Sequence, residues 1–523
     1  MRVYRSILND VLGPIMTGPS SSHCAGCCRI GLVTRQLFGK EIEHAEVVFD
    51  EDGSYPSTYI GQGSNYGFTG GLLGYETDDP RLKDAVEIAK EQNRQIVFRQ
   101  EALGALHPNQ AEIRIYDGDS VAMRVMTFSI GGGMFQIKGL DEFKVHIEGT
   151  DYQVFVCCRI PCAETLRRDL ENSGFVVESE NCPQTGRSLL CVRSHEDILS
   201  SVEHAVGDTE GVIYIRPVRP VVPNVRKQEN PPFFNAEEAL AYANGIGREL
   251  WQLLEDYEAG YGNISQGEIS ERIRSIRIAM EKSITPVDPT TTRKYGFLPY
   301  QAAGMRDALP AAETVNTGLI EAAMFAALSV LENSNAHNIV VAAPTAGSSG
   351  VIPAAIISVG RQLRKTDIEI ERAIMSAGVV GVFIANQATF GGEVGACQAE
   401  IGSACSMAAA GIVQLLGGSI HQSFSGASLA LQNMLGLICD PIAGLTEIPC
   451  IGRNVMAAAN AVMSANMILL GFNPVIPLDE VIHTMNEVGH QLPSELKCTC
   501  KGGLCTTMTG RQMAKRMEKR CSG

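Results

Sequence analysis

Three cysteines within residues 391–454 constrain the fold of this chain most. Cys397, Cys439 and Cys450 each lie among Gly, Pro or acidic residues, and they are spaced 42 and 11 positions apart. Zinc ribbons and ferredoxins instead use tightly spaced C-x-x-C pairs. Thiolates that share one metal here would have to come from separate loops that converge in space. The alternative is three structural cysteines, because a free cysteine behaves as a small buried hydrophobe. We assign Cys405, on an Ala-rich helical run, to the core.

The segment TGPSSSH, residues 17–23, places hydroxyl groups before a lone histidine at a predicted helix start. Amide and hydroxyl donors at a helix start suit a substrate carboxylate. An imidazole that titrates near neutrality suits a general acid or base. The alternative is that Ser20, Ser21 and Ser22 only cap the helix, as serines commonly do.

A second loop-like segment, APTAGSSG at residues 343–350, is rich in glycine and hydroxyl groups. Its backbone amides would suit an anion, although such a loop is also a common turn. It is not a P-loop, because no lysine follows at the required place. Polar residues close in sequence to the three cysteines would orient thiolates or substrate, or are ordinary satisfied polar groups; they are Asn386, Glu400, Asp440, Glu447 and Asn454.

Several segments together resemble the iron-sulfur-dependent L-serine dehydratases. The sequences GACQAEIGSA, GLICDPIAGL, EIPCIGRN and VAAPTAGSSGVIPA are similar to the catalytic half of that family. The sequences GPIMTGPSSSHCAGCCRIG and GGLLGYETDDPRL are similar to the other half, which is often a separate subunit. The resemblance covers nearly the whole chain except residues 150–225.

The resemblance implies that Cys397, Cys439 and Cys450 hold a [4Fe-4S] cluster with one open iron, a Lewis acid that helps a hydroxyl group leave. It also implies Cys521, in the basic tail, as a fourth ligand that substrate displaces; an exposed helix with an incidental thiol is the alternative. We expect His23, Ser21 and Ser22 in catalysis. The expected substrate-binding residues are Ser20, Gln62, Ser64, Asn65, Thr345, Gly347, Ser348 and Asn386.

The implied reaction converts L-serine to pyruvate and ammonia, with a base such as His23 taking the α-proton. No lysine stands in a recognisable pyridoxal-phosphate motif. The chain departs from the family at GQGSN, residues 61–65, where Gln62 replaces a histidine and Asn65 an aspartate, and Cys24 replaces a frequent threonine. A related lyase for threonine, cysteine or another β-substituted acid therefore stays open, as does a non-catalytic amino-acid or redox sensor.

The patterning predicts a multidomain protein. Residues 1–148 mix strands and helices in an α+β domain, and residues 149–220 follow a ferredoxin-like βαββαβ order. That order is similar to ACT domains, so the middle module would bind an amino-acid effector or serve a structural, dimerising role. A proline-rich linker, residues 221–232, precedes a mostly all-α catalytic domain at 233–523.

Bulk properties narrow the partners. The net charge of −15 argues against nucleic acid or an anionic membrane as a partner. The sequence contains no signal peptide pattern and no apolar run of membrane-spanning length. Sixteen cysteines without a secretion signal favour reduced thiols and a cytoplasmic location. The CTC at 498–500 lacks the spacing of a zinc knuckle, so we assign it no metal. We expect a homodimer, the commonest assembly for such an enzyme.

Overall fold

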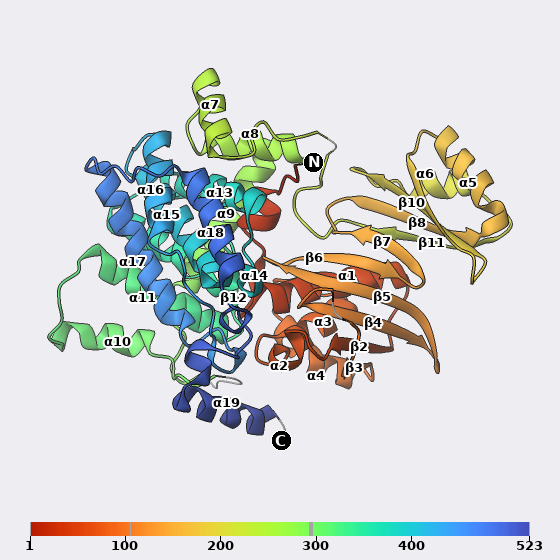
Figure 1. The fold of residues 1–523 in the computed structure, drawn as a ribbon, viewed down its shortest axis with the longest axis horizontal. Coiled ribbons are helices and arrows are strands. Elements are labelled where there is room, and N and C mark those ends of the chain that lie inside the picture. Colours follow the sequence, from red (N-terminus) through yellow and green to blue (C-terminus); the bar gives the residue numbers. More distant parts are fainter. Residues whose placement is uncertain (1, 105, 228, 292–295, 522–523) are drawn as a thin grey trace.

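The computed structural model describes residues 2–104, 106–227, 229–291 and 296–521, without the side chains of Ser57 and of residues 518–521. Figure 1 shows a helical half on one side, a six-stranded sheet with its helices beside it, and a small four-stranded module at the far end. The chain is thus a multidomain α+β protein. No helix in these ranges is both long and apolar enough to cross a membrane.

The larger sheet has the strand order β3-β2-β4-β5-β6-β7, and all neighbours are antiparallel except β2 and β3. Its strands are β2 (His44–Asp50), β3 (Gln95–Glu101), β4 (Gln110–Asp117), β5 (Ser120–Gly131), β6 (Met134–Leu140) and β7 (Phe143–Ile147). Apolar side chains alternate along β4 and β5, so one face is buried.

Helices cover that buried face. They are α1 (Gly26–Phe38), α2 (Tyr55–Thr58), α3 (Ser64–Leu73) and α4 (Ala85–Glu91). Helices α1 and α3 approach closely at Gly31 and Gly71: a Cβ at Gly71 would lie 2.0 Å from the carbonyl oxygen of Cys28. Close packing of these backbones therefore needs glycine, and it fixes the start of α1 against the sheet.

The middle module has the predicted βαββαβ order of elements. They are β8 (Tyr152–Arg159), α5 (Ile160–Asn172), β9 (Val177–Cys182), β10 (Arg187–Ser194), α6 (Leu199–Val206) and β11 (Val212–Val218). The sheet order is β11-β8-β10-β9, with every neighbour antiparallel. One face packs on α5 and α6, and Phe155, Leu189 and Val218 on the other join the core of the larger sheet.

Where the structure describes it, the C-terminal half is mostly helical, with the three-residue strand β12 (Ile339–Val341). Small residues let its central helices pack closely; a Cβ at Gly411 would lie 2.8 Å from the carbonyl oxygen of Ala373. The longer helices are α7 (Ala236–Ile246), α8 (Gln252–Tyr261), α9 (Gln266–Ser283), α11 (Leu319–Asn335), α13 (Asp367–Gln387), α15 (Ser403–Leu415), α16 (Ile420–Gln432), α17 (Cys450–Leu469), α18 (Leu478–Gln491) and α19 (Met508–Cys521). Shorter ones are α10 (Ala302–Ala308), α12 (Val359–Gln362) and α14 (Gly392–Cys397).

The two halves interlock at the amino terminus. Strand β1 (Ile15–Thr17) pairs antiparallel with β12, and the π-helical turn η1 (Ile7–Val11) is buried in the core of the helical half. Asn224, within the predicted linker, is fully buried, and its backbone N–H donates to the Asn9 side chain at 2.9 Å. The described part of the linker is therefore anchored to the amino-terminal segment at Asn224, although residues 223, 226, 229, 230 and 232 are exposed.

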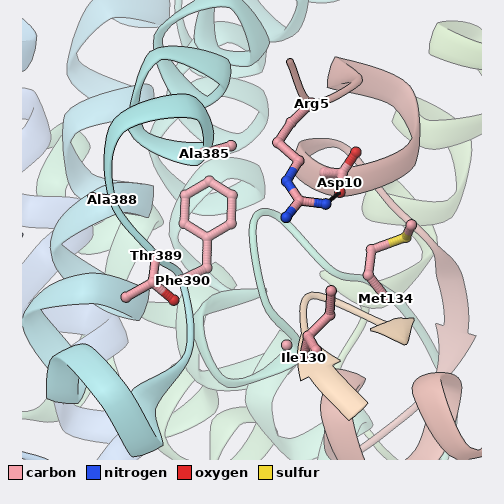
Figure 2. Close-up of a pocket in the computed structure, with 9 residues that line it drawn as sticks. Arg5, Asp10, Ile130, Met134, Ala385, Ala388, Thr389 and Phe390 are labelled. Atoms are coloured by element: carbon pink, nitrogen blue, oxygen red, sulfur yellow. Dashed lines mark ion pairs between the residues drawn. The ribbon is translucent and has the colours of Figure 1, made fainter. Parts of the chain in front are cut away.

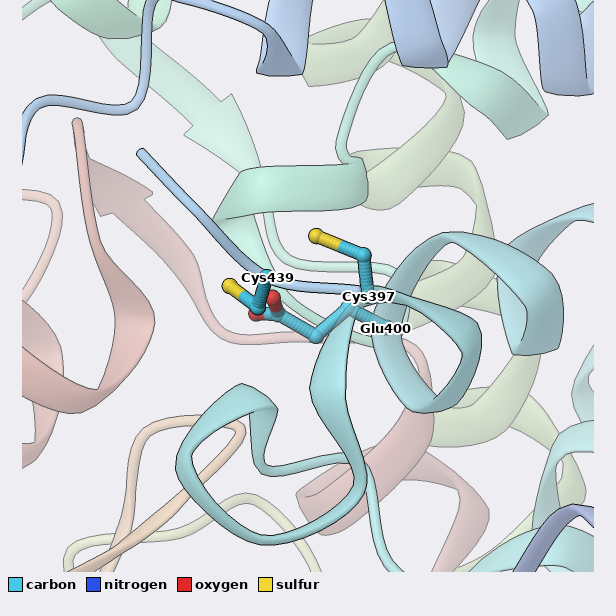
Figure 3. Close-up of side chains that lie close together, drawn as sticks. All are labelled: Cys397, Glu400 and Cys439. Carbon is cyan, nitrogen blue, oxygen red and sulfur yellow. The ribbon is translucent and has the colours of Figure 1, made fainter. Parts of the chain in front are cut away.

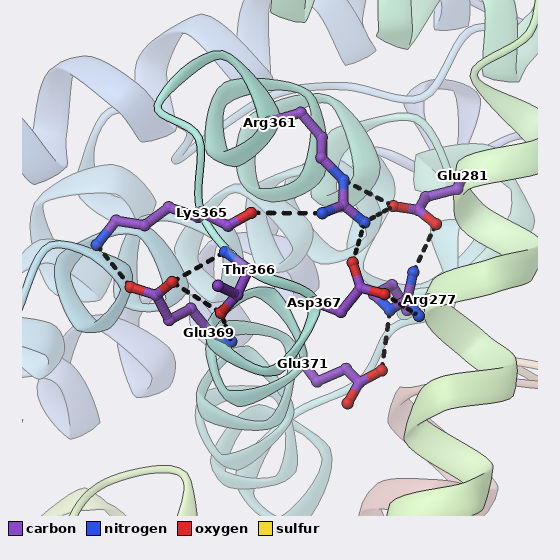
Figure 4. Close-up of polar contacts among 8 residues, drawn as sticks. All are labelled: Arg277, Glu281, Arg361, Lys365, Thr366, Asp367, Glu369 and Glu371. Atoms are coloured by element: carbon purple, nitrogen blue, oxygen red, sulfur yellow. Dashed lines mark hydrogen bonds and ion pairs between the residues drawn. The ribbon is translucent and has the colours of Figure 1, made fainter.

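An ion-pair cluster ties α9 to α12 and α13 (Figure 4). The guanidinium of Arg277, only 6% exposed, lies within 3.0 Å of carboxylate oxygens of Glu281, Asp367 and Glu371. Arg361 adds contacts to Glu281 and Asp367. Because the central cation is buried and serves three carboxylates, this cluster holds the outer helix α9 onto the core helix α13.

Candidate active site

A buried pocket lies where the two halves meet. Its walls come from residues 19–23, from Ser54 and Gln62, and from four segments of the helical half. The residues that line it are Pro19, Ser20, Ser21, Ser22, His23, Ser54, Gln62, Gly347, Gly392, Glu393, Cys397, Glu400, Ile401, Cys439, Pro441, Thr446, Cys450 and Cys498. Neither half encloses this site alone.

The three cysteines singled out by the sequence all line this pocket, and each comes from a different element. Cys397 ends α14, Cys439 lies in the loop after α16, and Cys450 begins α17. Ala396, just before Cys397, has φ 61° and ψ −169°, a conformation that is costly for any residue with a side chain. The structure holds it there, and so turns the Cys397 side chain out of the helical path.

Two of these thiols share their surroundings with a carboxyl group (Figure 3). The ligand atoms of Cys397, Glu400 and Cys439 all lie within 4.8 Å of one another. Contact with Cys439, assisted by Arg453, outweighs burial and lowers the pKa of Cys397. Burial raises the pKa of the Glu400 carboxyl well above its usual range. The pocket therefore favours the thiolate form of Cys397 and disfavours the charged form of Glu400.

The donor set fits an iron-sulfur cluster. Soft thiolates are the ligands that such clusters take, and here three converge from separate elements in a buried pocket. A cationic Arg453 Nη1 lies 3.5 Å from the Cys397 sulfur and balances negative charge. The space beside them depends on a glycine, since a Cβ at Gly392 would lie 2.6 Å from a Glu400 carboxylate oxygen and 3.5 Å from the Cys439 sulfur.

His23 faces this group from the other half, on the π-helical turn η2 (Ser21–Ala25). Its Nδ1 lies 2.9 Å from the Ser22 hydroxyl and its Nε2 lies 3.4 Å from the Ser54 hydroxyl. Burial lowers the pKa of His23 to about 3, so the imidazole is neutral at ordinary pH. Ser20 does cap this turn, because its hydroxyl accepts from the His23 backbone N–H at 3.2 Å. Capping and lining the pocket are compatible here.

The 343–350 loop contributes less directly. Gly347 lines the pocket, whereas Thr345 and Ser348 are buried behind it with their hydroxyl oxygens 3.1 Å apart. Asn454 positions this loop, because its side chain donates to the Gly347 carbonyl oxygen at 2.8 Å and accepts from the Gly350 backbone N–H at 3.1 Å.

Gln62 lines the pocket, and its side-chain amide donates to the Gly444 carbonyl oxygen at 2.7 Å. Ser64 and Asn65 lie in the first turn of α3 and are not among the lining residues. The remaining predicted residue of the tail, Cys521, lies outside what the structure describes at side-chain level. Cys405 is buried in the core, as predicted.

Asn386 does not join the pocket. Its side chain accepts from the Arg5 backbone N–H at 2.9 Å and donates to the Phe234 carbonyl oxygen at 2.9 Å. Asn386 thus supports the wall of a separate cavity (Figure 2). In that cavity Arg5 and Asp10 form an ion pair at 4.0 Å, opposite Phe390. Asn386, at the end of α13, therefore faces this separate cavity and not the pocket with the cysteines.

Several lining or adjacent groups carry no signal in the sequence alone. Ser54, Glu393 and Thr446 belong to no motif of their own. Arg453 lies inside EIPCIGRN, next to Asn454, and this position in the sequence is what could have marked it as a site residue. The CTC spacing argues against a metal role for Cys498, yet its side chain lines the pocket with the other three cysteines.

Comparisons with known proteins agree with this architecture. The family model for serine dehydratase alpha chains matches residues 194–505. A probable L-serine dehydratase alpha chain of Bacillus subtilis is 38% identical over 48% of this chain and 82% of its own length. An L-serine dehydratase of Streptomyces coelicolor is 29% identical over 94% of this chain and 96% of its own. L-serine dehydratase 2 of Escherichia coli is 28% identical over 93% and 96%.

The match to the Bacillus subtilis protein covers about half of the chain. The matches to the Streptomyces coelicolor and Escherichia coli proteins cover both halves that form the pocket. The family match spans more than half of the chain, and the two long alignments show the two parts on one polypeptide. The chain belongs to the serine dehydratase family of lyases, with its two parts fused.

Proposed function

We propose that this protein is a [4Fe-4S]-dependent L-serine dehydratase that converts L-serine to pyruvate and ammonia. The observation that supports it best is the shared pocket: the SSSH segment of one half and Cys397, Cys439 and Cys450 of the other line the same buried space. An acid-base group, hydroxyl donors and a soft-metal donor set are the parts that such a reaction needs.

His23 is the proposed base for the α-proton. Its imidazole is neutral, so a nitrogen lone pair is available to accept a proton. A pKa of about 3 makes it a weak base in these buried surroundings. A substrate carboxylate nearby would raise that pKa, because an opposite charge favours the imidazolium. Ser22 and Ser54, one on each ring nitrogen, hold the ring in place.

The substrate carboxylate is proposed to lie against the hydroxyls of Ser20, Ser21 and Ser22. All three line the pocket at the start of a helical turn, where hydroxyl and amide donors favour an anion. Ser21 also links the halves, since its hydroxyl accepts from the Ala346 backbone N–H at 3.3 Å. This bond between the halves therefore fixes the hydroxyl groups that would bind the substrate carboxylate relative to the three cysteine thiols.

Cys397, Cys439 and Cys450 would hold the cluster. When bound, it supplies a Lewis acid that makes the β-hydroxyl a better leaving group. Contact with Cys439 and the charge of Arg453 lower the pKa of Cys397, and the Asp440 carboxylate, 2.8 Å from Arg453 Nη2, fixes the guanidinium. After loss of water, the enamine product tautomerises and hydrolyses to the keto acid and ammonia in solution.

The direct test is keto-acid release from L-serine by anaerobically reconstituted protein of confirmed iron and sulfide content. We expect pyruvate from the intact chain and none from Cys397→Ala, with Cys405→Ala as a matched control because Cys405 is buried outside the pocket. A filled cluster without pyruvate would overturn serine as the substrate. Cluster-free protein with full activity would overturn the cofactor.

Gln62 is a reason to assay L-threonine and L-cysteine in parallel. It lines the pocket where relatives usually carry a histidine, and its amide is engaged with the Gly444 carbonyl. An uncharged amide there removes a titratable group close to the substrate. Turnover of a different β-substituted amino acid above that of serine would make this second candidate the function.

For the middle module we propose an ACT-like role in binding an amino-acid effector. The support is its βαββαβ order, its β11-β8-β10-β9 sheet and a cavity at its edge lined by Asp151, Arg193, Arg226 and Lys227. Both charge signs there suit a zwitterion. Isothermal titration with amino acids tests this; if none binds, the module is structural.

A further inference from the structure

We propose that Cys498 is a fourth thiolate ligand of the cluster, so that every iron is bound by a cysteine of this chain when substrate is absent. This inference rests on the proposed function, because it assumes the cluster on Cys397, Cys439 and Cys450. The side chain of Cys498 lines the same pocket as those three cysteines.

The backbone fixes Cys498 beside Cys439. The Cys439 N–H donates to the Leu496 carbonyl oxygen at 2.8 Å, and the Cys498 N–H donates back to the Cys439 carbonyl oxygen at 2.8 Å. These two bonds form a parallel bridge between Cys439 and Lys497. Both side chains line the same pocket. These backbone bonds therefore fix the position of the Cys498 thiol beside Cys439.

A second tether holds the loop after Cys498. The Asp440 carboxylate, which also holds Arg453, accepts from the Leu504 backbone N–H at 2.8 Å. Cys498 itself has φ 61°, in the left-handed region that is uncommon for a residue with a side chain. The tethers on both sides maintain this conformation and turn the thiol into the pocket.

The neighbouring cysteines point elsewhere. The sulfur atoms of Cys500 and Cys505 lie 3.3 and 3.2 Å from the Pro441 carbonyl oxygen, and neither residue lines the pocket. Glu400 is the other donor close to Cys439, but iron in such clusters prefers thiolate to carboxylate. Among the described residues that line the pocket, Cys498 is therefore the donor that suits the remaining iron.

Cluster stability follows from this arrangement. A four-iron cluster held by three cysteines loses its exposed iron on mild oxidation and becomes a paramagnetic three-iron cluster, whereas a fourth thiolate retains that iron. A thiolate on that iron also competes with a substrate oxygen. We therefore expect Cys498→Ala to lower KM for L-serine several-fold and to make the cluster lose iron on oxidation.

The test compares intact protein with Cys498→Ala, Cys500→Ala and Cys521→Ala after anaerobic reconstitution and one equivalent of ferricyanide. Electron paramagnetic resonance detects the three-iron product, and iron analysis counts what remains. We expect about four irons per chain in the intact protein and in Cys500→Ala and Cys521→Ala, but about three, with the three-iron signal, in Cys498→Ala. Circular dichroism and the Cys498→Ser variant check that the loss is not unfolding.

Two results would overturn the proposal. One is a three-iron signal of equal size in the intact protein and in Cys498→Ala. The other is retention of iron by Cys498→Ala together with its loss from Cys521→Ala, which would assign the ligand to the tail. Failure of the proposed cofactor looks different: no variant, the intact protein included, would then assemble a cluster. Failure of the proposed substrate would show as a filled cluster that forms no pyruvate from L-serine, whatever the iron count of Cys498→Ala. Pyruvate formation by an intact protein that loses iron as readily as Cys498→Ala would leave serine dehydration standing and remove only Cys498.

Discussion

The guanidinium of Arg453 lies 3.5 Å from the sulfur of Cys397, one turn along α17 from Cys450. The same side chain donates to the Ile438 carbonyl oxygen at 2.9 Å and to the Asp440 carboxylate at 2.8 Å. One arginine thus connects the elements that carry all three predicted ligands. Its positive charge is the nearest counter-charge to a group of buried thiols.

Replacement of Arg453 should therefore weaken cluster binding. In Arg453→Gln the Cys397 pKa rises, since the cation that helps lower it is gone. Partners that orient ligands commonly contribute a factor of about 10 to 100 in metal affinity, and we expect a loss of that size. Iron release to a competing chelator measures it. Arg361→Gln, in the outer ion-pair cluster, is the control, and equal iron retention in the two variants would contradict the prediction.

Gly392 should not tolerate a side chain. A Cβ there would lie 2.6 Å from the Glu400 carboxylate oxygen, so Gly392→Ala must displace that group beside Cys439. We expect a loss of activity of about tenfold or more and reduced iron content. Gly452→Ala is the matched control: Gly452 is exposed on α17, two residues after Cys450, and a Cβ added there would have nothing within 4 Å. Alanine there should stabilise the helix by about 0.5–1 kcal/mol and leave activity intact.

The parts of the site that local chemistry marks could be predicted from the sequence. Gly, Pro and acidic neighbours put Cys397, Cys439 and Cys450 at element ends, and all three line the pocket. Cys498 could not be found this way, because a backbone bridge between Cys439 and Lys497, far apart in the chain, brings it to Cys439 and leaves no spacing pattern. Sequence proximity also misdirected attention to Asn386, which faces Arg5 and not the pocket.

The fold could also be predicted only in part. The middle module was predictable because alternation along strands and helical periodicity are local signals, and its elements follow the expected order. The burial of residues 7–12 in the helical half was not, because it depends on contacts with α8 and α13 that lie hundreds of residues away. Residues 236–261 form the two helices α7 and α8, since Gly247 takes φ 67° and ends the first.

Arg277 should be a major contributor to stability. It is buried among the carboxylates of Glu281, Asp367 and Glu371. Arg277→Ala removes the cation beside Glu371 and leaves Glu281 and Asp367 with Arg361 alone. We expect a loss of about 3 kcal/mol in the free energy of unfolding, at the lower end for a broken buried pair because Asp367 is 54% exposed. Urea unfolding measures it. Arg274→Ala, exposed on the same helix, should change stability by less than about 0.5 kcal/mol; similar losses in both would contradict the role of the cluster.

The burial of His23 makes stability depend on pH in a defined window. Its pKa is about 3 in the folded protein and 6.5 as an ordinary side chain, so between these values the unfolded chain binds a proton that the folded one does not. Stability therefore falls as the pH drops below 6.5, by up to about 1.4 kcal/mol per pH unit for this one group, and is fully present above it. His23→Gln cannot take up that proton. We expect the cluster-free variant to lose less stability than the cluster-free intact chain between about pH 7 and pH 5, as measured by urea unfolding. Equal losses of stability in the two proteins would mean that His23 is accessible enough to take up a proton in the folded state. His23 could then no longer be described as a buried neutral base.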